Sequence, residues 1–185
     1  HSIDASAHFH EGAPSAHVNI IAHTISDRSR AHCFWGTEHI FCKHYPFEPA
    51  PGKGILSTTW VHRLVRMGVM DHAEAAKLEY DTDVVSYAEP DDFFYRTHDP
   101  PTIDRQGGDM GTQYRSAIFT TTPDQQTDAQ RVMEEVQAKH FTRKGLKIVM
   151  QILPAGPWWD AKDYHQLYLF KNPGGYQCPT HRVHW

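Results

Sequence analysis

The sequence predicts an α+β domain of two layers, built around a mixed or antiparallel sheet. Helical and strand-like segments alternate without a regular βαβ repeat, and the chain has no internal repeat. With 185 residues, of which 39% are hydrophobic and 12% aromatic, the chain is long enough for one domain with a sizeable core. We expect that domain to span residues 31–185, after an irregular N-terminal arm over residues 1–30, which show no clear periodicity.

The first elements of this domain follow from local patterns. Apolar residues at helical spacing predict a helix over 34–44, ended by the Pro- and Gly-rich segment 45–54. The β-branched run 55–61 predicts a strand. Residues 72–81 alternate in polarity and predict a second strand. Its apolar face includes Glu74, so that carboxyl is expected among hydrophobic neighbours.

The C-terminal half is expected to alternate strands and helices. Ser86 and Glu89 have the spacing of a capping box and predict a short helix that ends before Pro100. Pro123 at a first helical position predicts a long helix after a strand. The remaining expected elements are strands over 111–122 and 147–153, a helix over 160–171, and a coil tail.

Composition excludes several classes of function. The formal net charge is −4 with no basic stripe, so no nucleic-acid partner is expected. Mean hydropathy is −0.60, and no apolar run approaches the roughly 20 residues that span a bilayer, so no membrane association is expected. Three cysteines do not form a disulfide scaffold, which favours a reducing, cytoplasmic compartment. Of the 15 histidines, the six in residues 1–32 follow no tight metal-ligand pattern.

Cys33 is a candidate nucleophile because it directly precedes the first predicted helix. Unpaired N–H groups and the positive dipole end of a helix stabilise a thiolate and lower its pKa. The alternative is a buried, inert cysteine. Cys178 lies in a Gly- and Pro-rich tail that could swing, as a second, resolving thiol requires. It could equally be an incidental tail cysteine.

Three further polar residues are candidates for proton transfer. Burial would raise the pKa of the Glu74 carboxyl and make it a proton donor, unless a partner holds it as a structural acid. Asp109 and Tyr114 lie beside three glycines, which permit tight turns and could bring polar side chains into a site. The alternative is a plain loop that enters a strand.

Taken together, these segments resemble the methionine sulfoxide reductase A family, the peptide-methionine (S)-S-oxide reductases, in a fungal-like form. The matching pieces occur in the family's order and cover nearly all of residues 33–185. They are CFWGTEHIF, DHAEA, VSYAEPDDFFYRTHDP, RQGGDMGTQYRSAIF and AGPWWDAKDYHQLYLFKNPGGYQCPTH. The resemblance implies a two-layer α/β sandwich with a ferredoxin-like core, a mixed sheet and a long coil tail at the C-terminus.

The resemblance implies thiol chemistry. Cys33 would attack the sulfoxide sulfur, release methionine and become a sulfenic acid. Cys178 would condense with it to a disulfide, which thioredoxin reduces. The substrate would be free or protein-bound methionine sulfoxide. No metal or tightly bound cofactor is needed, and a monomer is expected.

The same resemblance assigns the substrate pocket. Phe34 and Trp35 would form an apolar seat for the substrate methyl group. Glu74 and Tyr114 would hydrogen-bond or protonate the sulfoxide oxygen, supported by Asp109.

The sequence departs from the family around this pocket. His32 stands where the family has glycine, and about a dozen residues are absent after His62 by comparison with the family pattern. The missing segment carries a tyrosine that binds the sulfoxide oxygen, and His62 lies at the nearest aligned position. RMG replaces the family's CSG at 66–68. One wall of the substrate pocket is therefore expected to be rebuilt, with His32 and His62 as new lining residues.

These departures leave other functions open. The first alternative is a repurposed, non-redox member of the fold, a cyclase or isomerase acting on a small, apolar metabolite, in which His32 and His62 serve as acid–base groups. The second is a non-enzymatic protein that binds copper or a sulfoxide.

Overall fold

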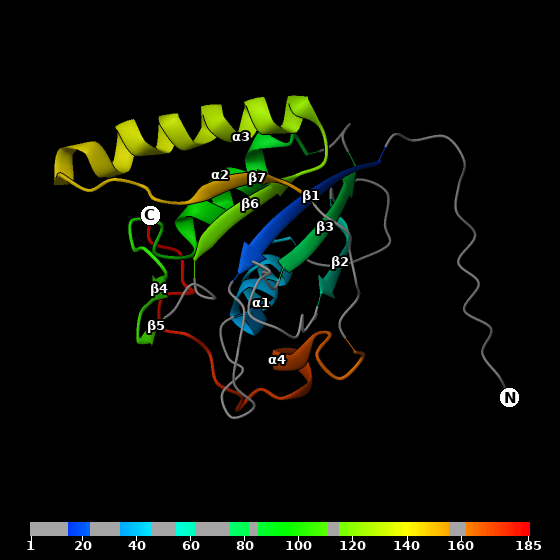
Figure 1. Cartoon of the computed structure of the whole chain (residues 1–185). Helices are drawn as coiled ribbons and strands as arrows, with labels where there is room; N and C mark the ends of the chain where they lie inside the picture. The colour runs from blue at the N-terminus through cyan, green and yellow to red at the C-terminus, as the bar shows by residue number, and fades with distance from the viewer. Residues whose placement is uncertain are drawn as a thin grey trace, which may run out of the picture.

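The structure is a computed structural model, and it describes residues 15–22, 34–45, 55–61, 75–81, 85–110, 115–155 and 162–185. Within these ranges a five-stranded mixed sheet has the order β2-β3-β1-β6-β7, and a two-stranded hairpin, β4-β5, lies apart from it. β6 and β7 pair in parallel, and the other pairs of the large sheet are antiparallel. Figure 1 shows the long helix α3 along one edge of the fold and α4 at the opposite end.

The expected irregular arm over 1–30 is wrong for its central part. Residues Ser15–Ala22 form β1, which lies in the middle of the sheet between β3 and β6. The segment SAHVNIIA is short and lies in a His-rich, polar stretch, so its strand pattern is weak. Pairing on both edges supplies the stability that local propensity does not, a common tertiary override in strands.

The helix and strands that follow agree with the sequence. α1 spans Phe34–His44, β2 spans Ile55–Val61 and β3 spans Ala75–Asp81. Ala76, Leu78 and Tyr80 are buried on the expected face of β3. Ala75 is also buried, because it packs with Ala117 of β6 on the other face of the sheet.

α2 spans Ala88–Arg96 and starts without the expected capping box. The residue before the helix is Tyr87, and no side chain caps the helix start. Instead, the backbone N–H of Glu89 donates to the carbonyl of Ser86 at 3.2 Å. Pro90 is tolerated because N–H groups in the first helical turn have no partner within the helix.

The strands of the C-terminal half are shorter than expected. β6 spans Ser116–Thr120 and β7 spans Gln151–Pro154, while β4 (Arg105–Gln106) and β5 (Asp109–Met110) form a hairpin that the sequence did not predict. Residues 147–150 do not join the sheet. There the Val149 N–H donates to the carbonyl of Pro100 at 3.1 Å.

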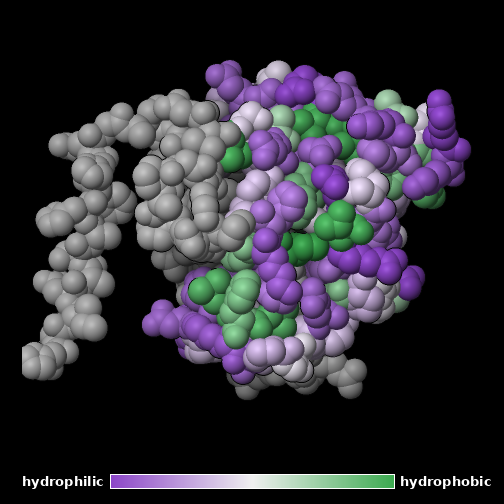
Figure 2. All heavy atoms as spheres, turned by 180° about the vertical axis from the view of Figure 1, so that it is seen from behind, coloured by the Kyte–Doolittle hydropathy of each residue, from purple (hydrophilic) through white to green (hydrophobic). Residues whose placement is uncertain are grey.

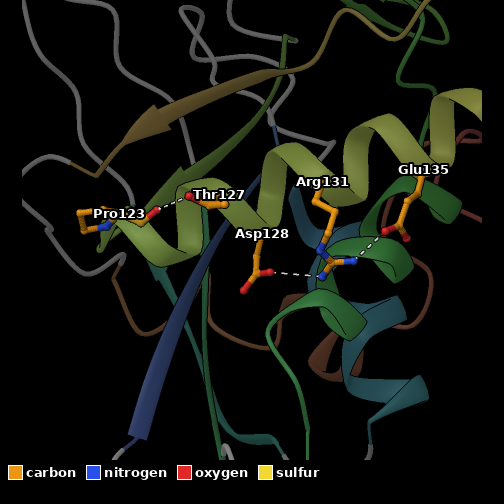
Figure 3. Close-up of polar contacts among 5 residues, drawn as sticks. All are labelled: Pro123, Thr127, Asp128, Arg131 and Glu135. Carbon is orange, nitrogen blue, oxygen red and sulfur yellow. Dashed lines mark hydrogen bonds and ion pairs between the residues drawn. The ribbon is translucent and has the colours of Figure 1, made fainter.

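α3 spans Pro123–Val136 and begins as predicted. Thr122 caps it by accepting a hydrogen bond from the Gln125 N–H at 3.2 Å, and proline takes an early helical position. On the exposed side, Arg131 reaches Glu135 at 2.8 Å and Asp128 at 3.2 Å (Figure 3). Exposed ion pairs of this kind contribute little to stability, so burial of Val132 and Val136 holds the helix in place.

The expected helix over 160–171 shrinks to α4, Tyr168–Lys171. Residues 162–167 form turns, and Leu167 has the left-handed conformation (φ 53°, ψ 37°), which ends any helix that would run into α4. The segment after α4 is coil with turns to residue 185, as expected.

One hydrophobic core joins three helices to the sheet. It includes side chains of α1, α2, α3, β3 and β6, so these helices pack against one face of the sheet. Its members with no more than 1% exposure are Phe41, Leu78, Tyr80, Phe94, Tyr95, Ile118 and Ala129. The face in Figure 2 is largely hydrophilic with separate hydrophobic patches. No helix among the described residues is long and apolar enough to cross a membrane.

A buried carboxyl lies inside this core. Asp91 of α2 has 0% exposure. Burial raises the pKa of the Asp91 carboxyl well above its usual range, the charge of Asp128 adds to the rise, and the nearby Tyr87 hydroxyl offsets part of it. Burial and Asp91 in turn raise the pKa of the Tyr95 hydroxyl.

Asp91 should make the stability of the domain depend on pH. Above about pH 3.9 the unfolded chain releases this proton while the folded chain keeps it, so stability falls as pH rises toward the raised pKa. The expected limiting slope is about 1.4 kcal/mol per pH unit. In urea titrations across pH 4–8, Asp91→Asn should lose this component and gain stability relative to the parent as pH rises. Parallel pH profiles for the two proteins would contradict this.

Candidate functional site

The structure describes only some of the residues that the sequence singles out. Cys33, Glu74, Tyr114, His32 and His62 lie outside the described residues. Phe34 and Asp109 are placed by backbone alone, as the first residues of α1 and β5. The side chains of Trp35 and Cys178 are described, and both are buried.

The first turn of α1 carries Phe34 and the buried Trp35. α1 begins at Phe34, as the sequence predicts, and the residue before it, Cys33, lies outside the described residues. Trp35 is 6% exposed, and its indole stacks on the ring of Tyr168, with centroids 3.4 Å apart and an interplanar angle of 14°. His165 lies at the side of the same indole, at 6.0 Å between centroids.

A buried glutamate in the same turn holds the segment that carries Tyr168. Glu38 is 1% exposed, and its Oε1 accepts a hydrogen bond from the Leu167 N–H at 3.0 Å. Sequence reasoning missed Glu38, Tyr168 and His165 as parts of the site. The available signal was their presence inside two of the quoted family segments, but no local pattern pairs residues so far apart in the chain.

Cys178 is buried within the C-terminal tail. The cysteine is 1% exposed, and its Sγ lies 3.1 Å from the Thr180 hydroxyl. A Cβ atom built on Gly107, in the turn of the β4-β5 hairpin, would lie 3.8 Å from the same sulfur. Gly107 has φ +55°, which fits the expectation that glycine permits a tight turn here. Cys178 is therefore held near the hairpin in this conformation, and its movement during the reaction stays a prediction.

His181 ties the cysteine's turn to α1. Its N–H donates to the carbonyl of Cys178 at 3.0 Å, and its ring, 4% exposed, lies against the backbone of Gly36. Burial, followed by the charges of His98 and His184, lowers the pKa of His181 to about 3, so the ring is neutral near pH 7. A Cβ atom on Gly36 would overlap the ring, whose Cγ would be at only 3.0 Å.

Gly36→Ala should therefore displace His181 and destabilise the domain, by about 1–3 kcal/mol for an overpacked core. Gly36→Ala combined with His181→Ala opens the space that the new methyl group needs. We expect the double variant to be less destabilised than the sum of the two single variants, measured by urea denaturation as a double-mutant cycle. Strict additivity would contradict this contact.

The end of the tail is fixed to α2 and to the π-helical segment Gln137–Phe141 that follows α3. Arg96 donates from Nε and Nη2 to the main-chain oxygen of Trp185, at 2.8 and 2.5 Å. The Trp185 indole stacks on His140 at 4.3 Å and meets Phe141 edge-on at 5.6 Å. The segment that carries Cys178 is thus held on both sides, by α4 before it and by Trp185 after it.

The hairpin near Cys178 is fixed by a buried amide. Gln106 has 0% exposure; its Nε2 donates to the Asp99 carbonyl at 2.8 Å and to the Ser116 hydroxyl at 3.2 Å, and its Oε1 accepts from the Asp99 N–H. This side chain joins the end of α2, the hairpin and β6. Among the described residues, no group of three or more His, Cys, Asp or Glu could hold a metal ion.

Comparisons with known proteins identify the class of this domain. The family model for peptide methionine sulfoxide reductase matches residues 30–184. A probable peptide methionine sulfoxide reductase of Schizosaccharomyces pombe is 49% identical over 165 residues, covering 84% of this chain and 94% of that protein. The peptide methionine sulfoxide reductase of Saccharomyces cerevisiae is 39% identical over 159 residues, covering 80% and 84%.

A solved structure agrees with this class. Mxr1 from Saccharomyces cerevisiae in its reduced form aligns with a TM-score of 0.73 and 32% identity, covering 92% of this chain and 93% of that one. The chain belongs to the peptide methionine sulfoxide reductase family, as its resemblance indicated. Each relative described here carries a reductase name, so the cyclase or isomerase alternative is not favoured.

Proposed function

We propose that this protein reduces methionine (S)-sulfoxide to methionine by thiol chemistry at Cys33. The observation that carries the proposal is the family match over residues 30–184, which includes the helix start behind Cys33 and the tail with Cys178. The thiolate attacks the sulfoxide sulfur, methionine leaves, and the oxygen remains on Cys33 as a sulfenic acid. The thiol of Cys178 then forms a disulfide with Cys33 and releases water.

In this proposal the pocket residues keep the roles that the resemblance implies. Phe34 and Trp35 form the apolar seat for the methyl group, and the burial of Trp35 against Tyr168 supports a rigid, dry wall. Glu74 and Tyr114 act on the sulfoxide oxygen with support from Asp109. His32 and His62 are proposed to line the altered side of the pocket.

Thioredoxin is the proposed reductant of the disulfide. Support comes from Mxr1 of Saccharomyces cerevisiae, whose reduced form is 32% identical to this chain and which has also been crystallised in complex with Trx2. A cytoplasmic location belongs to the same proposal, since the reaction needs thiols that a reducing compartment maintains. The proposal also takes the protein as a monomer.

The finer description of the fold is also a proposal. We take the domain, residues 31–185 together with β1, as a two-layer α/β sandwich related to ferredoxin-like cores. The common core that α1, α2 and α3 form against one face of the sheet supports this arrangement.

The direct test is turnover by the purified protein. Reduction of methionine (S)-sulfoxide should proceed with either thioredoxin and its reductase or dithiothreitol, followed by methionine release. This chain lacks the family's tyrosine that binds the sulfoxide oxygen. We expect that loss to make its rate roughly 10²–10³ lower than with the tyrosine, without abolishing turnover, by analogy with an oxyanion-hole donor. No methionine release with either reductant would overturn the proposal.

A further inference from the structure

We propose that Glu38 is a positioning residue that sets the wall of the substrate pocket through the backbone of Leu167. The inference rests on the proposed function, because it takes Trp35 as the wall that receives the substrate methyl group. It adds a residue to which neither the sequence pattern nor the proposed reaction assigns a part.

The first observation is an unusual backbone at Leu167. This residue has φ 53° and ψ 37°, the left-handed region that side chains other than glycine rarely adopt. Burial of the side chain does not account for it, because Leu167 is 39% exposed. A strained backbone persists only where its surroundings fix it, and such residues cluster at functional sites.

The second observation is the set of hydrogen bonds that holds the backbone of Leu167. Glu38 and Leu167 are 129 positions apart, and the Glu38 carboxyl, 1% exposed, accepts the Leu167 N–H at 3.0 Å. The carbonyl of Leu167 accepts the N–H groups of Phe170 and Lys171, both at 3.1 Å. The backbone of Leu167 is thus bound on one side to α1 and on the other to α4.

The third observation is the consequence for the next residue. Tyr168 follows Leu167 and lies flat on the Trp35 indole at 3.4 Å between centroids. Its carbonyl accepts the N–H and the side-chain amide of Asn172, at 2.8 and 3.0 Å. Gly175 packs against the ring, since a Cβ there would lie 2.9 Å from Cε1 of Tyr168.

These contacts form a closed loop through α1. Glu38 and Trp35 lie three positions apart in one helix and therefore face the same side. Glu38 holds the backbone of Leu167, directly before Tyr168, and Trp35 stacks on the ring of Tyr168. The orientation of the indole is then determined by the carboxyl of Glu38, a group that need not touch the substrate itself.

Three variants separate this role from a general loss of fold. Glu38→Gln keeps an oxygen that can accept the Leu167 N–H, whereas Glu38→Ala removes it. Leu167→Gly in the Glu38→Ala background supplies a residue that adopts the left-handed conformation without support. Lys171→Ala is the matched control, because it removes an exposed contact in the same segment, from Nζ to the Asp163 carbonyl at 3.0 Å.

Activity is measured as kcat and KM for methionine (S)-sulfoxide with dithiothreitol, so that thioredoxin docking has no influence. We expect Glu38→Ala to lower kcat/KM about 10- to 100-fold, chiefly through KM, as misplacement of a positioning group does. Glu38→Gln and Lys171→Ala should stay within about threefold of the parent on the same scale. Leu167→Gly should restore part of the loss.

A second readout does not depend on catalysis. Near-ultraviolet circular dichroism reports the Trp35–Tyr168 stack, and we expect the band that Trp35→Phe removes to weaken in Glu38→Ala and to persist in Glu38→Gln. Parent-like kcat/KM and dichroism in a folded Glu38→Ala would overturn the inference, as would equal impairment of the Gln and Ala variants. If the parent protein itself lacks activity, the proposed function fails, and the dichroism still tests the role of Glu38.

Discussion

Replacement of Cys33 by serine is expected to abolish methionine release, with a loss of at least about 10³-fold in kcat. A serine hydroxyl at this position has no base assigned to activate it and cannot hold the oxygen as a sulfenic acid. Methionine release should be measured with both thioredoxin and dithiothreitol. The loss should be the same with both, because Cys33 acts before either reductant does. Activity that survives this substitution cannot be the proposed reaction.

The other two cysteines give this experiment its internal controls. Cys178→Ser should keep the first step and release one methionine per chain without a reductant. With dithiothreitol, turnover should continue. With thioredoxin, it should stop after the first methionine, because no disulfide forms. Cys42→Ser should turn over like the parent, since Cys42 is buried in α1 and has no part in the reaction. Full turnover of Cys178→Ser with thioredoxin would contradict its role as the resolving thiol.

The second large effect is on stability, at the aromatic cluster that joins α1 to α2. Phe93 is 2% exposed; its ring meets Phe41 edge-on at 4.9 Å and Tyr45 edge-on at 5.6 Å, and it stacks on His44 at 4.0 Å. Phe93→Ala removes all three contacts and leaves a cavity. We expect a loss of about 3–5 kcal/mol in the free energy of unfolding, measured by urea denaturation.

A matched control for this substitution exists on the surface. Phe170 is 46% exposed and meets only the edge of His39 among the described aromatic contacts, at 4.7 Å. Phe170→Ala should cost far less than Phe93→Ala. Equal losses for the two variants would show that the cluster does not carry the contact between α1 and α2.

Local signals in the sequence predicted some elements correctly, for identifiable reasons. α1 has the bounds Phe34–His44 that its apolar spacing indicates, and α3 starts at the proline that predicts it. Both depend on interactions within a few residues. β2 also follows from a local run of β-branched residues.

The misses depend on contacts between distant parts of the chain. β1 is stabilised by pairing with β3 and β6, and α4 begins only after the left-handed Leu167, whose N–H bonds to the distant Glu38. The burial of Cys178 also depends on distant partners, since Trp185 and His181 hold the tail against α2 and α1. No periodicity within a segment encodes such partners, although the quoted family segments contain many of them.

The buried position of Cys178 has a consequence for the proposed cycle. A thiol with 1% exposure, held near Thr180 and Gly107, is not available to thioredoxin in this conformation. Disulfide formation with Cys33, or release of the segment between α4 and Trp185, must therefore precede reduction. Sulfenic acid at Cys33 should accumulate wherever that release is slow.

The central claim is that sulfoxide reduction oxidises Cys33 and then Cys178. The reduced protein is incubated with methionine (S)-sulfoxide and no reductant, and methionine is quantified while the cysteines are mapped by peptide mass spectrometry. We expect one methionine per chain and a Cys33–Cys178 disulfide, with Cys42 unmodified. No methionine, with all three cysteines still reduced, would contradict it.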